Sequence, residues 1–137
     1  MLKYFTPNEF PEDIKYADKS LLYSLDDLRG FIGVPIYPSP VPGALARFGN
    51  TTSMHKIPSK AIDVFIQGDT AETYTKILQS GLFNGVGVYF DTYYRNKSWV
   101  MFHLDKRDKK LIWYRDKYVY HYPQEEDFYE RLYTMIL

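Results

Sequence analysis

The feature that most constrains the fold of this 137-residue chain is an aspartate within an apolar run. Asp63 lies in the segment 60–66, most of whose other residues are typical of a buried β-strand. Aspartate is depleted from strands, and a carboxylate buried in one needs a partner to offset its loss of hydration. Two histidines are candidate partners: His55, in the polar segment eight residues before Asp63, and His103, in the second apolar run 100–104.

Two histidines and one carboxylate form a ligand set that suits zinc, with one position left open for water. The chain contains no cysteine, which excludes disulfide bonds, thiol catalysis and cysteine-based metal sites. Any bound metal must therefore be held by histidine, aspartate or glutamate. We predict a Zn²⁺ ion bound by His55, Asp63 and His103.

Hydrophobic periodicity predicts an α+β fold in a single domain that spans residues 1–137. Apolar residues at helical spacing predict a first helix from about Asp18 to Gly33, and Asp69 with Glu72 resembles a capping box that opens a second. We expect a central, mainly antiparallel sheet of about four strands, with two helices on one face and a metal cleft on the other. The expected strands cover residues 60–66, 86–90, 98–104 and 111–114.

Side-chain alternation predicts which residues share a face of the sheet. Asp63 points away from its immediate neighbours in strand 60–66, and His103 and Asp105 lie on the same face of their strand. Gly87, inside another expected strand, marks either a bulge or a close approach of the backbone. On the first helix we expect Asp26 to lie on the solvated side.

The segments around these residues also resemble a known family. Residues 53–63 carry Ser-x-His followed by Ala-x-Asp, and residues 102–105 carry an apolar-His-apolar-Asp pattern. Both patterns resemble the signature of the D-alanyl-D-alanine carboxypeptidase-like zinc peptidases, which are common among phage lysins and bacterial cell-wall peptidases. The resemblance covers roughly residues 4–114, and it implies that His55, Asp63 and His103 are the metal ligands.

The resemblance also implies substrate-binding residues, although the chain departs from the family pattern. Ser53 belongs to the first motif and is assigned to substrate binding. The family often has Ser-Gly-Tyr-Arg where residues 39–42 of this chain are Ser-Pro-Val-Pro. The nearest arginine, Arg47, is therefore either a clamp for a substrate carboxylate or a surface residue. Many relatives have an acid three residues before the last histidine, and that position here is Val100.

Asp105 is the carboxylate that the pattern places nearest to His103. The Cα atoms of residues two apart in a strand are separated by about 6.6 Å, so Asp105 can reach either an attacking water or the histidine ring. Three roles stay open: general base, holder of the ligand imidazole, and turn residue. We name Asp105 as the candidate catalytic residue.

The resemblance implies a zinc-dependent peptidase that hydrolyses an amide bond in peptidoglycan stem peptides. The alternative is a phage particle component that keeps the fold for assembly after catalysis has lapsed, which Val100 and the missing Ser-Gly-Tyr-Arg favour. Residues 115–137 lie outside the resemblance and are rich in tyrosine, a residue enriched at protein interfaces. Under this alternative, the segment is a candidate contact with phage structural proteins.

Charge and hydropathy narrow the expected partners and location. The 17 basic and 17 acidic residues cancel, so we expect neither nucleic acid nor a membrane as the main partner. The charged turn 106–110 either attracts acidic peptide ends or is simply solvated. The first ten residues lack the apolar segment of a secretory signal. We therefore expect synthesis in a host cytoplasm and action at the cell wall after lysis or as part of a virion.

Overall fold

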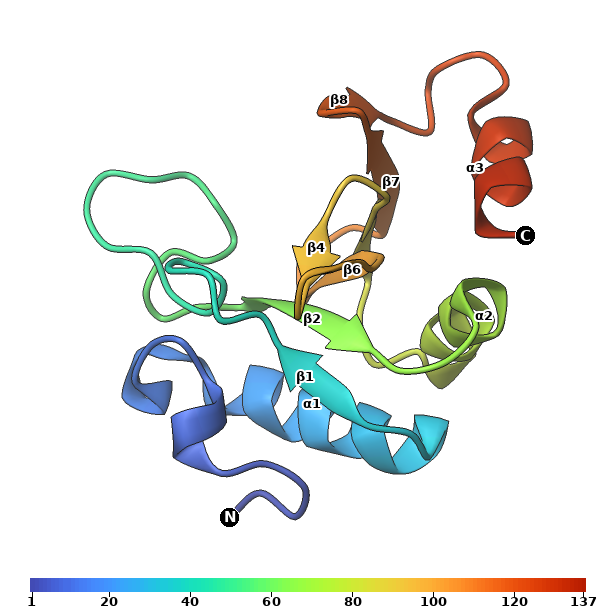
Figure 1. Ribbon diagram of the computed structural model, residues 1–137. Helices are drawn as coiled ribbons and strands as arrows, with labels where there is room; N and C mark the ends of the chain where they lie inside the picture. The colour runs from blue at the N-terminus through green and yellow to red at the C-terminus, as the bar shows by residue number, and fades with distance from the viewer.

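The chain folds into three α-helices and eight β-strands, described over residues 1–137 by a computed structural model (Figure 1). Six strands form one mixed sheet in the order β1-β2-β6-β3-β7-β8, and β4 and β5 form a separate two-stranded sheet. The α+β class is therefore confirmed. The helices are α1 (Lys19–Ile32), α2 (Thr70–Ser80) and α3 (Phe128–Ile136). The strands are β1 (Ile36–Pro38), β2 (Ala61–Ile66), β3 (Gly85–Tyr89), β4 (Tyr93–Tyr94), β5 (Lys97–Ser98), β6 (Met101–Asp105), β7 (Leu111–Asp116) and β8 (Val119–His121).

The main sheet is larger than the expected four antiparallel strands. The two additional strands are short edge strands: β1 pairs with β2, and β8 pairs with β7. Such short segments give too little alternation to be separated from loops by sequence. One pair, β3 with β7, runs parallel, because β6 lies between β2 and β3 and the chain leaving β6 must pass to the far side of β3.

One face of the main sheet carries the hydrophobic core. Ile62 and Val64 on β2, and Phe102 and Leu104 on β6, point into this core. Burying a side chain of this size contributes about 1.5–3 kcal/mol to the free energy of folding. These contacts therefore hold the helices against the sheet. The helices contribute Leu21, Leu25, Leu28, Ile77, Phe128 and Leu132 to the same core. The alternate residues of β2 and β6, including Asp63 and His103, face the other way, as predicted.

The bounds of α1 follow the local sequence signals closely. Asp18 caps the first turn by accepting a hydrogen bond from the Ser20 N–H, and Gly33 ends the helix in the left-handed conformation. The prediction for Asp26 was wrong, because this side chain is buried rather than solvated. Its carboxylate accepts hydrogen bonds from the backbone N–H groups of Lys3 and Tyr4, and so ties the N-terminal arm to α1.

The second helix begins as predicted, with Asp69 accepting from the Ala71 N–H. Glu72 does not reach back to complete a capping box but forms an exposed ion pair with Lys76, one helical turn later. None of the helices is both long enough and apolar enough to cross a membrane. In Figure 1, α2 and α3 lie to the right of the sheet, and the long loop 39–60 extends to the left.

Candidate metal centre

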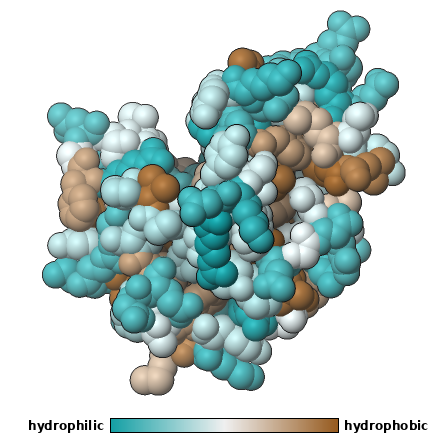
Figure 2. Space-filling view, in the orientation of Figure 1, coloured by the Kyte–Doolittle hydropathy of each residue, from teal (hydrophilic) through white to brown (hydrophobic).

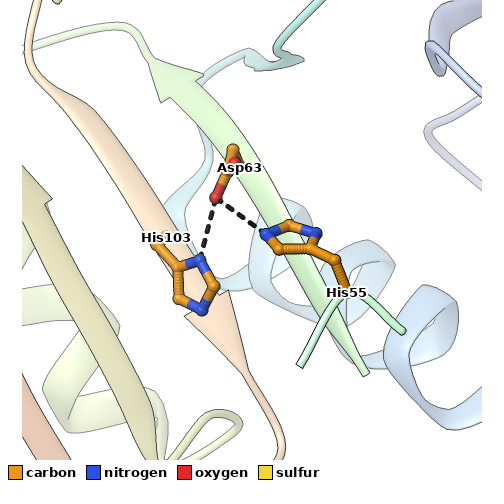
Figure 3. A group of neighbouring side chains, drawn as sticks. All are labelled: His55, Asp63 and His103. Atoms are coloured by element: carbon orange, nitrogen blue, oxygen red, sulfur yellow. Dashed lines mark hydrogen bonds and ion pairs between the residues drawn. The ribbon is translucent and has the colours of Figure 1, made fainter. Parts of the chain in front are cut away.

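The centre is built on the face of the sheet that is turned away from the core. Asp63 on β2 stands directly opposite His103 on β6 in the antiparallel register. The His103 Nδ1 atom lies 2.9 Å from Asp63 Oδ1. His55 approaches the same oxygen from the loop 39–60, with its Nε2 atom 3.4 Å from Asp63 Oδ1 (Figure 3). The structure therefore brings together the three residues predicted as ligands.

Hydrogen bonds to the backbone fix the orientation of His55. Its Nδ1–H donates to the carbonyl of Leu45 at 3.2 Å, and its backbone N–H donates to Ser53 Oγ at 3.1 Å. The backbone N–H of Arg47 donates to the His55 carbonyl at 2.9 Å. The Leu45 carbonyl thus sets the tautomer, which leaves the lone pair of Nε2 directed at Asp63.

The Nε2 atom of His55 has the most unusual surroundings in the centre. It is fully buried and has no hydrogen-bond partner, although it lies within ion-pair distance of Asp63. A lone pair that faces a carboxylate oxygen is repelled by it unless a proton or a metal cation lies between them. Buried polar atoms without a partner are rare in folded proteins, so this atom needs an explanation.

On its other side, His103 is held by a second buried carboxylate. The His103 Nε2 atom lies 2.8 Å from Asp105 Oδ2, and Asp105 is completely buried. Arg107 neutralises Asp105 through two hydrogen bonds, one of them from Nε to Asp105 Oδ1 at 2.8 Å. This geometry matches the carboxylate–histidine–metal arrangement, in which a carboxylate accepts from the outer ring nitrogen and the inner nitrogen binds the ion.

The pKa values of the centre reflect this concentration of partners. Burial alone would raise the pKa of Asp63, but the hydrogen bond with His103 and the nearby imidazole of His55 outweigh it and hold the pKa well below its usual range. Burial alone would lower the pKa of His103, but its hydrogen bonds with Asp105 and Asp63 raise it. Both shifts favour the protonated, positively charged form of His103 between the two carboxylates.

The donor atoms lie close enough together to share one cation. The ligand atoms offered by His55, Asp63 and His103 all lie within 4.8 Å of one another, and all three residues are buried. Two atoms bound to tetrahedral zinc at about 2.0–2.1 Å are themselves roughly 3.4 Å apart, which is close to the His55–Asp63 separation. This group could therefore hold a metal ion.

Two glycines on β3 leave room for the side chains around His103. A Cβ on Gly85 would lie 1.8 Å from Asp105 Oδ1, and a Cβ on Gly87 would lie 2.6 Å from the ring of Trp113. The Trp113 ring in turn packs against His103, with 5.0 Å between centroids. Of the two roles expected for Gly87, the close approach is therefore confirmed.

A cleft leads to the metal centre from solvent. Two adjoining hollows, of about 400 and 200 Å³, share Ser53, Tyr89, His103 and Tyr120 among their lining residues. Arg47 lines the smaller hollow beside His55 and Asp63, and its exposed side chain forms no ion pair. Figure 2 shows the surface hollowed between the lobe at the left, which carries the loop 39–60, and the lobe at the upper right, which carries β7 and β8.

Acidic groups are scarce in this cleft. Asp63 is the only acid among the residues that line the two hollows. Val100, at the position where many members of the resembled family carry an acid, packs against the core on the other face of the sheet. A larger hollow of about 770 Å³, between the N-terminal arm and α1, shares no residue with the metal centre.

Sequence reasoning missed the role of Arg107. The sequence predicts a charged turn that is either solvated or attracts acidic peptide ends. In the structure, Arg107 of this turn is partly buried and paired with Asp105. The available signal was spacing, because Arg107 continues the alternation that puts His103 and Asp105 on one face. Its guanidinium also lies over the Trp113 ring, 4.9 Å from the centroid.

Comparison with models of known protein families, with curated proteins and with solved structures gave no match to this chain. The chemical interpretation of the centre therefore depends on its own residues and on the two motifs that contain them.

Proposed function

We propose that this chain is a zinc-dependent peptidase that hydrolyses an amide bond in peptidoglycan stem peptides. The observation that supports this most directly is the buried Nε2 atom of His55, which faces Asp63 without a hydrogen-bond partner. A cation bound by His55, Asp63 and His103 would resolve this contact and leave one position open toward the cleft. The same residues occupy the motif positions that resemble those of the cell-wall zinc peptidases.

Zinc is the cation we propose, because two imidazoles and one carboxylate without cysteine suit it. When bound, it would polarise the scissile carbonyl and lower the pKa of water to about 7. The protein side chains would supply positioning and charge. Ser53 caps the turn at His55 and lines the cleft. The Arg47 guanidinium lies at the cleft wall, where its Nε–H donates to the Gly43 carbonyl and no carboxylate pairs with it. We propose that Arg47 binds a carboxylate of the substrate peptide.

Of the three roles considered for Asp105, the geometry favours that of ligand holder. Asp105 accepts from His103 Nε2, on the side of the ring opposite to the atom that faces Asp63. Both of its oxygens are also engaged by Arg107, and it does not line the cleft. A carboxylate in this position fixes the imidazole and strengthens it as a ligand, but it has no path to an attacking water.

The proposal is tested by metal analysis combined with digestion of purified peptidoglycan. We expect close to one zinc per chain after dialysis and a zinc-dependent release of new amine ends from cross-linked stem peptides. His103→Ala should lose both the zinc and the activity. His121→Ala is the matched control, because this third histidine stacks on Tyr114 and pairs with Glu125, away from the centre. Sub-stoichiometric zinc that added metal cannot restore counts against the ligand assignment.

A second candidate function is a phage particle component in which catalysis has lapsed. It is favoured by the absence of a second acid in the cleft and by exposed tyrosines near the C-terminus. Tyr118, Tyr129 and Tyr133 are each more than 60 % exposed, which suits a protein contact. The core, however, includes Phe128 and Leu132, so removing the segment 115–137 would disturb folding as well.

Substitution of surface residues separates the two functions more cleanly than truncation does. Under the structural reading, Tyr129→Ser combined with Tyr133→Ser should prevent incorporation into a particle while zinc content is unchanged. Under the enzyme reading, the same variant should release amine ends as the parent does. A parent protein that binds zinc but cleaves no peptidoglycan chemotype favours the structural function.

A further inference from the structure

The N-terminal arm of the chain is bonded to the loop that carries His55. The carboxylate of Glu12 accepts hydrogen bonds from three backbone N–H groups of residues 43–46 in that loop. These are the N–H groups of Gly43 at 3.0 Å, Leu45 at 3.0 Å and Ala46 at 2.9 Å. They are the only hydrogen bonds that the Glu12 side chain makes. Hydrogen bonds to an ionised acceptor are among the stronger ones in proteins, so Glu12 fixes this segment firmly.

The segment fixed by Glu12 is the one that orients the metal ligand. Leu45 is bonded on both sides of its backbone: its N–H donates to Glu12, and its carbonyl accepts from His55 Nδ1. The hydroxyl of Ser59 also donates to the Leu45 carbonyl. The Leu45 carbonyl belongs to the same peptide unit as the Ala46 N–H, which also donates to Glu12. Any shift of this peptide unit would move the acceptor that sets the tautomer and direction of His55.

The arm also holds the far end of the same loop. The backbone N–H of Ser59 donates to the Tyr16 carbonyl at 2.8 Å, and the N–H of Asp18 donates to the Ser59 carbonyl at 2.8 Å. Residues 12–18 therefore clamp the loop before and after His55. The segment that Glu12 fixes also contacts Asp63, whose backbone N–H donates to the Ala44 carbonyl at 3.0 Å, whereas His103 is held by the pairing of β6 with β2 and β3.

We propose that Glu12 is a positioning residue of the metal centre, which holds the Leu45 carbonyl in place and so directs His55 Nε2 toward Asp63. This inference rests on the proposed function only in taking the centre to bind zinc. It implies that the N-terminal arm tunes metal affinity without touching the metal.

Zinc affinity of Glu12→Ala, compared with a matched variant in the same arm, tests the proposal. The matched variant is Asp26→Ala, whose carboxylate also accepts from backbone N–H groups but ties the arm to α1 instead of the loop. In a competition titration with a chromophoric chelator, Glu12→Ala should bind zinc about 10- to 100-fold more weakly, the usual effect of losing a group that supports a ligand. Asp26→Ala should lose stability but keep the parent affinity. Equal affinities for Glu12→Ala and the parent would overturn the proposal.

Glu12→Gln provides a conservative variant in case the alanine variant does not fold. Its amide oxygen can still accept from Leu45 and Ala46, whereas the bond from Gly43, made to the other carboxylate oxygen, is lost. We expect Glu12→Gln to recover most of the zinc affinity that Glu12→Ala loses. A glutamine variant that binds zinc no better than a folded alanine variant contradicts a role for the Leu45 contact.

A readout without metal separates this proposal from the proposed function. In zinc-free protein, NMR should detect faster solvent exchange of the His55 Nδ1 proton in Glu12→Ala than in Asp26→Ala. If the parent binds no zinc, the proposed function fails, but this exchange rate still decides whether Glu12 positions His55. Unchanged exchange in Glu12→Ala would overturn the proposal regardless of metal binding.

Discussion

Asp63 and Asp105 flank the same histidine, yet their surroundings differ. Asp63 Oδ1 lies 2.9 Å from His103 Nδ1, and Asp105 Oδ2 lies 2.8 Å from His103 Nε2. Both carboxylates are buried, and burial alone would raise both pKa values, although their partners lower them. Asp105 faces Arg107, a permanent cation, whereas Asp63 faces only His103 and His55.

The partners of the two carboxylates, rather than their burial, distinguish their roles. The charge of Asp105 is neutralised by the guanidinium of Arg107, so this carboxylate needs no further cation. It is therefore suited to holding the His103 ring in place. A carboxylate that faces only imidazoles has no permanent counter-charge, and one of those imidazoles presents an unpartnered nitrogen. Buried charges in proteins are paired or bind metals, and Asp63 is the carboxylate that we propose binds an added cation.

Among the variants that test this comparison, we expect Asp63→Ala to show the largest loss of zinc affinity. Removing a ligand should reduce zinc affinity by more than the roughly 10- to 100-fold loss that is typical when a group supporting a ligand is removed. Isothermal titration of zinc into the metal-free protein measures this loss. Retention of near-parental affinity in Asp63→Ala would mean that the two aspartates have been assigned the wrong roles.

A smaller loss of affinity is expected from Asp105→Asn. The amide keeps the size of the side chain but leaves Arg107 without its counter-charge and weakens the hold on His103. Zinc affinity should fall about 10- to 100-fold, and hydrolysis at saturating zinc should be largely retained. If hydrolysis instead slows by about 100-fold while zinc affinity is unchanged, Asp105 acts as the general base.

The sequence predicts only part of the contrast between the two aspartates. Asp63 could be identified because a carboxylate within an apolar strand is unusual, and alternation correctly put His103 and Asp105 on one face. The pairing of Asp63 with His103 depends on the register of β2 against β6, which connects residues 40 positions apart. Long-range register of this kind has no local sequence signal beyond the need to bury one face.

The support around the centre was less predictable for the same reason. Glu12 acts on the backbone of residues 43–46, and backbone donors leave no trace in the side-chain pattern. The fold class, both long helices and the four main strands follow from periodicity and caps, which are local. The position of β6 between β2 and β3, and hence the parallel β3–β7 pair, depends on packing of the whole sheet.

Gly85→Ala tests the support of Asp105 without changing any charged group. The new methyl group would occupy the space of the Asp105 carboxylate, so that side chain or the strand must shift. Overpacking of this kind costs about 1–3 kcal/mol of unfolding free energy, measurable by urea denaturation. We also expect weaker zinc binding. Val86→Ala, which loses core packing on the other face of β3, is the control that should destabilise the protein without affecting zinc.

The smallest effect we expect is a gradual dependence of stability on pH in the metal-free protein. Burial would lower the pKa of His103, but the hydrogen bonds with Asp105 and Asp63 raise it above the unfolded value of about 6.5. The stabilisation from this raised pKa is complete below pH 6.5 and is lost as the pH rises through the folded pKa. The depressed pKa values of Asp63 and Asp105 contribute no slope there, because both carboxyls are ionised in either state.

Zinc should reverse the sign of this dependence. The ion requires a neutral imidazole and therefore competes with the proton on His103, so the stabilisation by zinc should grow as the pH rises from 6 to 8. Urea unfolding with chelator and with excess zinc, at several pH values in this range, measures both trends. In His103→Gln both should disappear, whereas His121→Ala should keep them. Metal-free stability that increases between pH 6.5 and 8 would show that the charge between Asp63 and Asp105 is not a proton on His103.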